Sequence, residues 1–553
     1  MSYLQAVSVV LAHLAGVFYD NLQIAQRALL NELKPIGSAR YDSLRACLSG
    51  TRTDVIKRIV DWSQKRDTLE GLLWVYGQAG LGKSSIATSV CQELDGKKLL
   101  AAEFFCKRDS SERRDSQQVL TTIVYGLSSR HSGYAKRVAD AIQEDPRLCN
   151  SPIQMQFDNL VKTPLEILSK ATLATNLVVV VDALDECGTY ESRRQLLAYL
   201  HRMSQLAPWL KIIVTSRSDP DIQSFFNEQT TSGVCRENVY EYNASKDIQS
   251  FIQHRMNNNH KSEHLPPDAL NVLTERADGL FIWAKTACDL ILGSLDPKSR
   301  FDLVIGKTGL NHSSSPLDAL YTTAIETSLG TGGAEDAQCI QQCIGAIIVC
   351  STQKPLSVAS LSDLLGDQVD RNVLQYVVDS LGSVLYTDLT QGGVVRVYHH
   401  SFTDFMTTSA RSGRFCVDLG RQNTDFTRCC LQTMIIGLRF NICGLETSHI
   451  RNSQISDLST QIERAVSIHL RYSCLYWTSH LMRSKRGEVE DLLREFLLRP
   501  TILYWIEVLS LLGQLDVAMY SALELSKWCE VCGLCLLCGY GDPNCASSRF
   551  DRG

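Results

Sequence analysis

The sequence predicts an α/β core, a parallel β-sheet with helices on both faces, followed by regions that are mainly helical. Between residues 70 and 235, short runs rich in β-branched residues alternate with helical patterns, which is the arrangement that produces a parallel sheet. A glycine-rich turn joins the first of these runs to the helix after it. The 553 residues, 44% of them hydrophobic, are enough to build several separate cores.

Four runs in the core have the length and composition of strands: residues 72–76, 99–105, 177–181 and 210–215. Helical patterns fill the intervals at residues 83–93, 117–127, 164–173 and 192–203. We therefore predict one α/β domain over residues 70–235, preceded by a helical lead-in segment over residues 1–69.

The pattern changes again after this domain. Residues 236–335 read as a helical domain with no evident strand, and residues 411–528 as a leucine-rich C-terminal helical region. Residues 336–410 contain three helical stretches and then two β-like runs that flank Gln391-Gly-Gly393, which is typical of a winged-helix domain. Residues 529–553 form a cysteine-rich tail.

Composition excludes several functional classes. The net charge of −5 provides no basic excess for nucleic acid, and Asp379 is the only charged residue in the third predicted helix of the winged helix, residues 372–381. No apolar run is long enough for a membrane span, and no basic residue precedes the apolar stretch 4–18. We expect a cytoplasmic protein with mostly buried thiols and with neither nucleic acid nor a membrane as partner.

The strongest motif is Gly77-Gln-Ala-Gly-Leu-Gly82-Lys83-Ser84, which matches the phosphate-binding pattern G-x-x-x-x-G-K-[ST] in full. Glycines let successive N–H groups face phosphate oxygens, and the helix that begins at Lys83 adds its positive end. Lys83 is expected to reach the β- and γ-phosphates, and Ser84 to ligate Mg²⁺. The predicted nucleotide contacts in this P-loop are Gly77, Gln78, Ala79, Gly80, Leu81, Gly82, Lys83, Ser84 and Ser85.

An acidic run follows the third predicted strand, as Asp182-Ala-Leu-Asp185-Glu186. A buried strand that ends in a carboxylate is how a P-loop protein holds Mg²⁺ opposite the nucleotide, so Asp182 is the predicted metal ligand. Ala183 occupies the place where a glutamate often follows the first aspartate. A residue that orients the attacking water must therefore be Asp185 or Glu186.

The fourth predicted strand ends in Thr215-Ser216-Arg217. A planar, permanently charged guanidinium suits phosphate oxygens, so Arg217 is a candidate sensor of the γ-phosphate. Without the other two motifs, an ordinary surface arginine would be as good an interpretation.

Together these motifs resemble NACHT-type STAND P-loop NTPases, and most closely the fungal, basidiomycete-like set with a nephrocystin-3-like N-terminal domain. The order of P-loop, acidic run, Thr215-Ser-Arg217, helical domain and winged helix carries the resemblance, which spans about residues 5–528. Shorter segments add to it: Gly50-Thr-Arg52, Phe104-Phe105 with Lys107-Arg108-Asp109, Gly279-Leu-Phe-Ile-Trp283 and His399-His-Ser-Phe402.

The resemblance implies a signal-transduction switch of the kind used in innate immunity, with ADP held in a closed form and ATP and self-association in an open form. It implies that His399 contacts the ADP phosphates, with His400 as the neighbouring alternative, and that Arg52 lies near the adenine. It also implies an effector protein that the sequence does not identify. Relatives carry a sensor repeat array after the helical region, so we expect a core whose sensor is missing or a truncated gene model.

Two further segments are better explained without a functional site. The tail spacing of Cys529, Cys532, Cys535 and Cys538 can hold zinc or an iron–sulfur cluster, but no separated second pair follows and leucines fill the gaps. We therefore expect a disordered tail or an artefact of the gene model. The mixed-charge run 107–115 predicts a solvated loop.

The combined prediction is a slow, Mg²⁺-dependent ATPase that resets a nucleotide-controlled self-association. Lys83, Arg217 and either Asp185 or Glu186 would act on the reacting phosphate, while Ser84 and Asp182 hold the metal. A nucleotide-binding scaffold without hydrolysis is the main rival, because a glutamate is missing after Asp182. A metabolic kinase is disfavoured by the long helical region after the core, and the absence of a guanine-specific motif favours ATP and ADP.

Overall fold

The computed structural model describes residues 25–66, 70–168, 175–229, 233–306, 315–329, 334–447, 449–485 and 487–532. The chain forms two compact units, residues 1–309 and residues 310–553. The helix predicted within the first 24 residues and the cysteine-rich tail beyond residue 532 lie outside the described residues.

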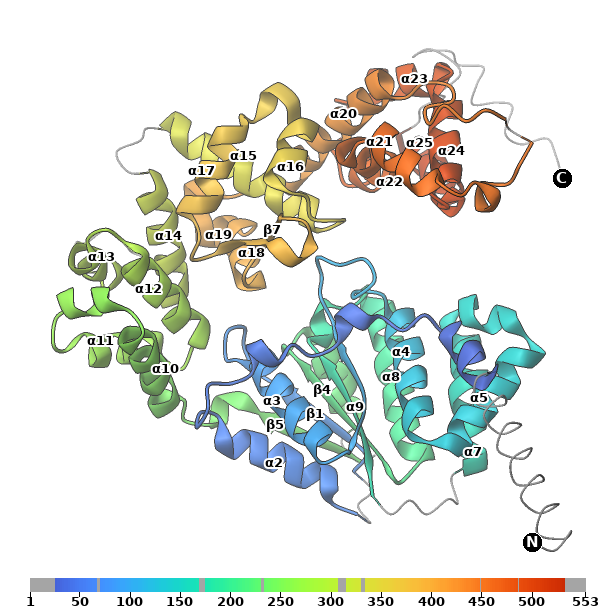
Figure 1. Cartoon of the computed structure of the whole chain (residues 1–553). Helices are drawn as coiled ribbons and strands as arrows, with labels where there is room; N and C mark the ends of the chain where they lie inside the picture. Colours follow the sequence, from blue (N-terminus) through green and yellow to red (C-terminus); the bar gives the residue numbers. More distant parts are fainter. Residues whose placement is uncertain are drawn as a thin grey trace, which may run out of the picture. The chain divides into compact units, whose positions relative to one another are not determined.

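A five-stranded parallel sheet lies at the centre of the first unit, which confirms the predicted α/β core (Figure 1). The strand order is β2-β3-β4-β1-β5, so β4 separates the strand before the P-loop from the strand before the acidic run. The strands are β1 (Leu72–Tyr76), β2 (Leu100–Phe105), β3 (Leu177–Asp182), β4 (Leu210–Ser216) and β5 (Val234–Asn238). Because ligands of parallel α/β sheets bind at the carboxyl ends of the strands, this order sets the P-loop, the acidic run and Thr215 along one edge.

The fifth strand corrects the expectation that no strand follows residue 235. β5 pairs with β1 alone, with Leu72 opposite Val234 and Tyr76 opposite Asn238. An edge strand has a neighbour on one side only, and of its five residues Glu237 alone is buried. The sequence Val-Cys-Arg-Glu-Asn therefore lacks the apolar run by which the other four strands could be predicted.

Helices cover both faces of the sheet, as predicted (Figure 1). Side chains alternate along β1: Leu73 and Val75 join a core with the helices α2 and α3, while Leu72 and Trp74 join a larger core with α4, α5, α8 and α9. The helices are α2 (Thr53–Gln64), α3 (Lys83–Gly96), α4 (Ser116–Arg130), α5 (Ser132–Glu144), α6 (Ile153–Gln156), α7 (Thr163–Leu168), α8 (Tyr190–Leu206) and α9 (Pro220–Glu228). A π-helical turn, Phe157–Lys162, joins α6 to α7.

Four further helices complete the first unit and pack on one another. They are α10 (Ser245–Asn257), α11 (Ala269–Ala277), α12 (Phe281–Gly293) and α13 (Pro297–Val304). The start of α12 touches the P-loop, since the Ile282 N–H donates a hydrogen bond of 3.2 Å to the Gly80 carbonyl. This helical group is therefore connected to the nucleotide edge through the P-loop backbone.

The second unit is mainly helical, with one antiparallel pair of strands, β6 (Leu385–Asp388) and β7 (Val394–Val397). The pair follows α15 (Ala334–Ser351), α16 (Val358–Leu365) and α17 (Arg371–Ser380). The remaining helices are α14 (Pro316–Leu329), α18 (His400–Met406), α19 (Ser409–Ser412), α20 (Leu419–Gly437), α21 (Leu458–Ala465), α22 (Ile468–Leu481), α23 (Glu490–Leu498), α24 (Thr501–Leu511) and α25 (Leu515–Cys532).

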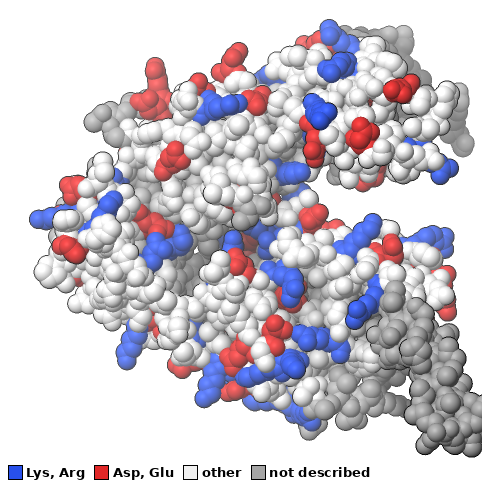
Figure 2. All heavy atoms as spheres, in the orientation of Figure 1, with Lys and Arg blue, Asp and Glu red and all other residues white. Residues whose placement is uncertain are grey.

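Surface and thiol chemistry agree with the composition. The face drawn in Figure 2 carries basic and acidic side chains interspersed. All fifteen cysteines whose side chains the structure describes are free thiols, and ten of them are buried. Within the described part of the chain, no helix combines the length and the hydropathy that crossing a membrane requires.

Candidate nucleotide site

The P-loop lies between β1 and α3, as the motif requires, and two of its glycines cannot be replaced without strain. Gly80 and Gly82 have φ values of +87° and +86°, which side chains other than hydrogen disfavour. A Cβ atom on Gly80 would lie 2.2 Å from Cγ2 of Ile282. The loop is therefore fixed both by its own backbone conformation and by the start of α12.

Lys83 turns back over the loop. Its Nζ donates hydrogen bonds to the carbonyl oxygens of Gly77, at 2.7 Å, and of Gln78, at 2.8 Å. Burial lowers the pKa of Lys83 to about 8, while the nearby Asp185 opposes the shift. An ammonium held by two carbonyls on the phosphate-binding loop is placed to exchange them for phosphate oxygens.

Asp182 and Ser84 provide a pair of oxygen ligands. Asp182 is buried at the end of β3 and accepts hydrogen bonds from the hydroxyls of Thr215 and Ser84. Burial raises the pKa of the Asp182 carboxyl, and both hydrogen bonds oppose that rise. Because Mg²⁺ prefers hydroxyl and carboxylate oxygens, and these two lie within hydrogen-bond reach of each other, the residues present fit the ion.

Thr215 connects the metal-side acid to the turn that follows it. Its Oγ1 accepts a hydrogen bond of 3.0 Å from the Ala183 N–H, while its own proton goes to Asp182. Ala183 has the left-handed φ of +54°, an uncommon conformation for alanine that turns the chain into the short helix Leu184–Glu186. The motif Thr215-Ser216-Arg217 had not predicted this role for Thr215.

Asp185 is buried and acts as a brace, that is, it holds neighbouring arginines in place. Its carboxylate accepts the Arg217 N–H at 3.0 Å and pairs with the Arg217 guanidinium at 3.3 Å. Its backbone carbonyl accepts hydrogen bonds from Arg193, at 2.9 Å, and from Arg108, at 3.2 Å. The side-chain carboxylate and the backbone carbonyl of Asp185 thus both accept hydrogen bonds from arginines.

Glu186 differs from its neighbour. Among the described residues, its carboxylate accepts one hydrogen bond, from the backbone N–H of Arg108 at 3.1 Å. Burial and the negative charge of Asp185 raise the pKa of Glu186 to about 7, while Arg108 and Arg217 oppose the shift. A carboxyl that titrates near neutrality beside a phosphate-binding loop is suited to proton transfer or to orienting water.

Arg52 is buried beneath the P-loop. Its Nη2 donates to the Leu81 carbonyl at 3.0 Å, its backbone N–H donates to Asp247 of α10 at 3.0 Å, and its guanidinium lies 4.9 Å from the ring centre of Phe281. Burial lowers its pKa, and Asp247 opposes the shift. Arg52 therefore joins the loop backbone to the helical group α10–α12.

His399 belongs to the second unit, where it caps the start of α18. Its Nδ1 accepts the Ser401 N–H at 3.2 Å and lies 2.6 Å from the Ser401 hydroxyl, which in turn meets the Tyr321 hydroxyl at 2.7 Å. Nε2 of His400 lies 3.6 Å from Oδ1 of Asp404. The nucleotide contact expected for His399 remains a prediction.

The structure brings the P-loop, Asp182, Asp185, Glu186 and Arg217 together at the carboxyl edge of the sheet. Sequence reasoning missed the roles of Thr215, Arg108, Arg193 and Asp247. Thr215 and Arg108 stood inside quoted motifs, so their positions next to strand ends were a usable signal. Arg193 on α8 and Asp247 on α10 stand outside the quoted motifs and carry no such signal.

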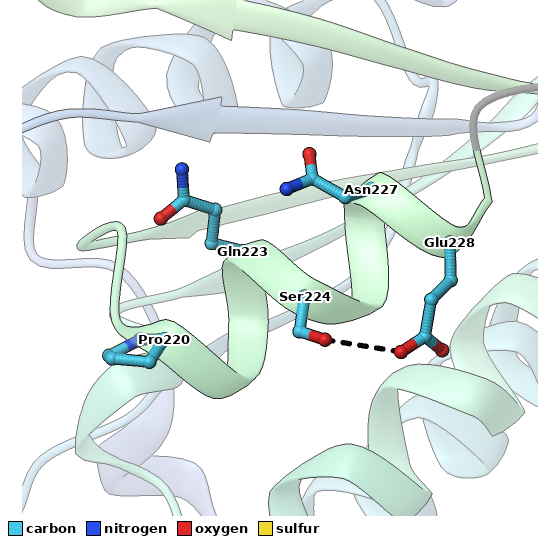
Figure 3. A pocket seen from close by; sticks show the side chains of 5 residues that line it. All are labelled: Pro220, Gln223, Ser224, Asn227 and Glu228. Atoms are coloured by element: carbon cyan, nitrogen blue, oxygen red, sulfur yellow. Dashed lines mark hydrogen bonds between the residues drawn. The ribbon is translucent and has the colours of Figure 1, made fainter.

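Two surface hollows lie elsewhere in the first unit. One runs along α9, where Gln223, Asn227 and Glu228 project from one side of the helix and Ser224 donates to Glu228 at 3.1 Å (Figure 3). The other lies between α2 and β5 and is lined by residues that include Arg58, Trp62 and Glu237. Neither lining includes the P-loop or the acidic run, so neither is the nucleotide site.

Residues 50–217 match the family model described as nephrocystin 3, N-terminal. A search of curated proteins finds the vegetative incompatibility protein HET-E-1 of Podospora anserina, a NACHT protein, 26% identical over 495 residues. The alignment covers 82% of this chain and 34% of that protein, so the chain spans about a third of the length of this relative.

Solved structures provide only weak likenesses. The Aeropyrum pernix ORC1 protein in complex with DNA is 12% identical, with 67% of this chain and 93% of that chain covered and a TM-score of 0.30. A Walker-type ATPase of Pyrococcus abyssi is 14% identical, with 64% and 96% covered and a TM-score of 0.28. TM-scores this low say nothing about what the present chain binds.

The match over residues 50–217 coincides with the segment that holds the P-loop, the acidic run and Arg217. The similarity to a NACHT protein extends over most of the chain. With its parallel sheet and complete P-loop, this chain is similar to the nephrocystin 3 N-terminal family over residues 50–217 and to a NACHT protein over most of its length.

Proposed function

We propose that this protein is an ATP- and ADP-binding signalling switch in which slow hydrolysis returns the ATP-bound form to the ADP-bound form. The observation that supports the proposal most strongly is the meeting of Lys83, Ser84 and Asp182 at one edge of the sheet. This combination offers a cation for phosphate and oxygen ligands for Mg²⁺ in one place.

In this proposal, the backbone of Gly77–Ser85 binds the phosphates, and Lys83 leaves the carbonyls of Gly77 and Gln78 to stabilise negative charge on them. Ser84 and Asp182 would hold Mg²⁺, which when bound neutralises charge between the β- and γ-phosphates. Thr215 keeps the Asp182 carboxylate in place.

We assign the water-orienting role to Glu186 and a bracing role to Asp185. Asp185 is occupied by the backbone and side chain of Arg217, whereas Glu186 has one hydrogen bond among the described residues and a pKa raised to about 7. Arg217, held by Asp185, would face the γ-phosphate. These contacts support Glu186 over Asp185 as the water-orienting residue of the proposal.

The regulatory part of the proposal extends to the second unit. We propose that α15–α17 and the β6–β7 pair form a winged helix, that His399 contacts the ADP phosphates in a closed form, and that ATP favours self-association and engagement of an effector protein. Moving such an equilibrium from mostly closed to mostly open needs about 5.5 kcal/mol of differential affinity, so the two nucleotides must bind the two forms very differently.

The nucleotide carried by the purified protein tests this proposal. We expect co-purified ADP that is lost in Lys83→Ala, together with slow single-turnover hydrolysis of added Mg·ATP and a larger particle with a non-hydrolysable ATP analogue. Bound nucleotide without hydrolysis above the Lys83→Ala background would favour a scaffold, and an empty site that takes up no nucleotide would refute both functions.

A further inference from the structure

The loop after β2, residues 107–115, has no buried residue, as its mixed charges predicted, and its own backbone bonds give it a fixed form. The Ser110 N–H donates to the Lys107 carbonyl at 3.1 Å, the Arg114 N–H donates to the Ser110 carbonyl at 3.0 Å, and the Lys107 N–H donates to the Arg113 carbonyl at 3.2 Å. The Arg113 guanidinium fastens the loop to the end of β2 by donating to the Phe105 carbonyl at 2.8 Å. The loop is therefore a closed unit fixed to the sheet.

This loop forms hydrogen bonds with both ends of the acidic turn, residues 185–188. At one end, Arg108 donates its backbone N–H to the Glu186 carboxylate and its Nη2 to the Asp185 carbonyl. At the other end, the Arg114 carbonyl accepts the Gly188 N–H at 2.7 Å and the Cys187 thiol at 3.5 Å. Four consecutive residues, 185–188, are thus held by one loop that is about 75 residues distant in the sequence.

Arg108 is distinct from the other arginine that anchors the loop. Arg113 bonds within its own loop and strand, to the Phe105 carbonyl and the Ser110 hydroxyl, and burial lowers its pKa. Arg108 instead donates two hydrogen bonds to the acidic turn, and the residue is exposed. Arg113 therefore supports the loop, while Arg108 connects the loop to the acids.

The charges around Glu186 give Arg108 an electrostatic effect as well. Asp185 is the negative neighbour that favours the protonated Glu186, and Arg108 and Arg217 are the positive neighbours that favour its ionised form. Arg217 forms an ion pair with Asp185, whereas Arg108 donates its backbone N–H to the Glu186 carboxylate.

We propose that Arg108 is a positioning residue for Glu186, holding its carboxylate in the orientation and charge state in which it can direct a water molecule at the γ-phosphate. The inference rests on the proposed hydrolytic function, and it adds a residue from a loop that the P-loop and acidic motifs do not include. Arg108 acts through Glu186 and does not itself need to touch the nucleotide.

Single-turnover hydrolysis of Mg·ATP by the full chain tests this role. Arg108→Ala keeps the backbone N–H that bonds Glu186 but removes the guanidinium charge and its bond to the Asp185 carbonyl. We expect it to lower the rate constant about tenfold with unchanged ATP affinity, because a misplaced group costs rate and not binding. Arg108→Lys should recover part of the loss, since it restores the charge. In a Glu186→Gln background, Arg108→Ala should cause no further loss, whereas an additional tenfold loss there would overturn the inference.

A matched control is Arg147→Ala, which removes an exposed arginine that pairs only with Asp145. It should leave the rate constant unchanged. An equal loss in this variant would mean that the effect of Arg108→Ala is nonspecific.

Amide hydrogen exchange supplies a readout that needs no hydrolysis. Arg108→Ala should speed exchange in peptides that cover residues 183–190, and Glu186→Gln should speed it in peptides that cover residues 105–115, with no change in Arg147→Ala. Unchanged exchange in both peptides would overturn the pairing even in an active enzyme. Absence of hydrolysis in the wild type would instead refute the proposed function, while the exchange data still decide whether Arg108 positions Glu186.

Discussion

The P-loop and the acidic turn lie at the same sheet edge but are built in different ways. The P-loop depends on residues next to one another in the sequence, above all on Gly80 and Gly82 with their left-handed backbone. The acidic turn depends on side chains from three other segments: Arg108 after β2, Arg193 on α8 and Arg217 after β4. The first follows from a local sequence pattern, although Ile282 and Arg52 also bond its backbone, whereas the second depends on tertiary contacts.

This difference explains what could be predicted from the sequence. A local structure leaves a local pattern, so the P-loop and the inner strands were predicted correctly. The division of roles between Asp185 and Glu186 left no pattern, because it follows from which arginine reaches which carboxylate. The edge strand β5 was missed because four of its five residues are not buried and it carries no apolar run, unlike β2 at the other edge, which is buried throughout.

The largest effect should come from changing the local structure. Gly80→Ala forces a side chain into a left-handed conformation and into Cγ2 of Ile282, so we expect about 2–4 kcal/mol of lost stability and loss of nucleotide binding. Thermal unfolding and a nucleotide-binding titration would measure both. Gly96→Ala is the control: its Cβ meets nothing within 4 Å, and at the end of α3 alanine should be neutral or better.

The next prediction separates the two acids of the tertiary structure. Asp185→Asn removes the charge that pairs with Arg217, and we expect it to cost about 1.5–3 kcal/mol of stability, because the buried Asp185 side chain loses its charge-assisted bonds to the half-buried Arg217. Glu186→Gln should not lower stability at pH 8. Equal destabilisation by the two substitutions would contradict the distinction between brace and water-orienting residue.

The pH dependence of stability sharpens the same distinction. Because the folded protein holds the pKa of Glu186 near 7, above its ordinary value of 4.5, the folded state binds the proton more tightly than the unfolded state. Stability contributed by this proton is present below pH 4.5 and is lost as the pH rises to about 7. Glu186→Gln should remove this decline, so its stability relative to wild type should rise between pH 5 and pH 8 by up to about 3 kcal/mol. Parallel pH profiles for the two proteins would show that Glu186 is not perturbed.

The smallest expected effect concerns Lys83. Its pKa of about 8 means that the unliganded lysine loses its proton in mildly alkaline solution, and the neutral amine cannot pair with phosphate. We expect ADP affinity to be constant up to about pH 7.5 and to fall about tenfold by pH 9. Lys83→Arg, whose side chain stays charged, should bind more weakly but without this fall, and calorimetric titration across the pH range would compare the two.

The central claim is that Glu186, and not Asp185, directs water at a nucleotide held by the P-loop. Single-turnover hydrolysis of Mg·ATP by wild type, Glu186→Gln and Lys83→Ala tests it most directly. The account predicts that Glu186→Gln binds ATP as the wild type does and hydrolyses it no faster than Lys83→Ala. Hydrolysis by Glu186→Gln at the wild-type rate would contradict it.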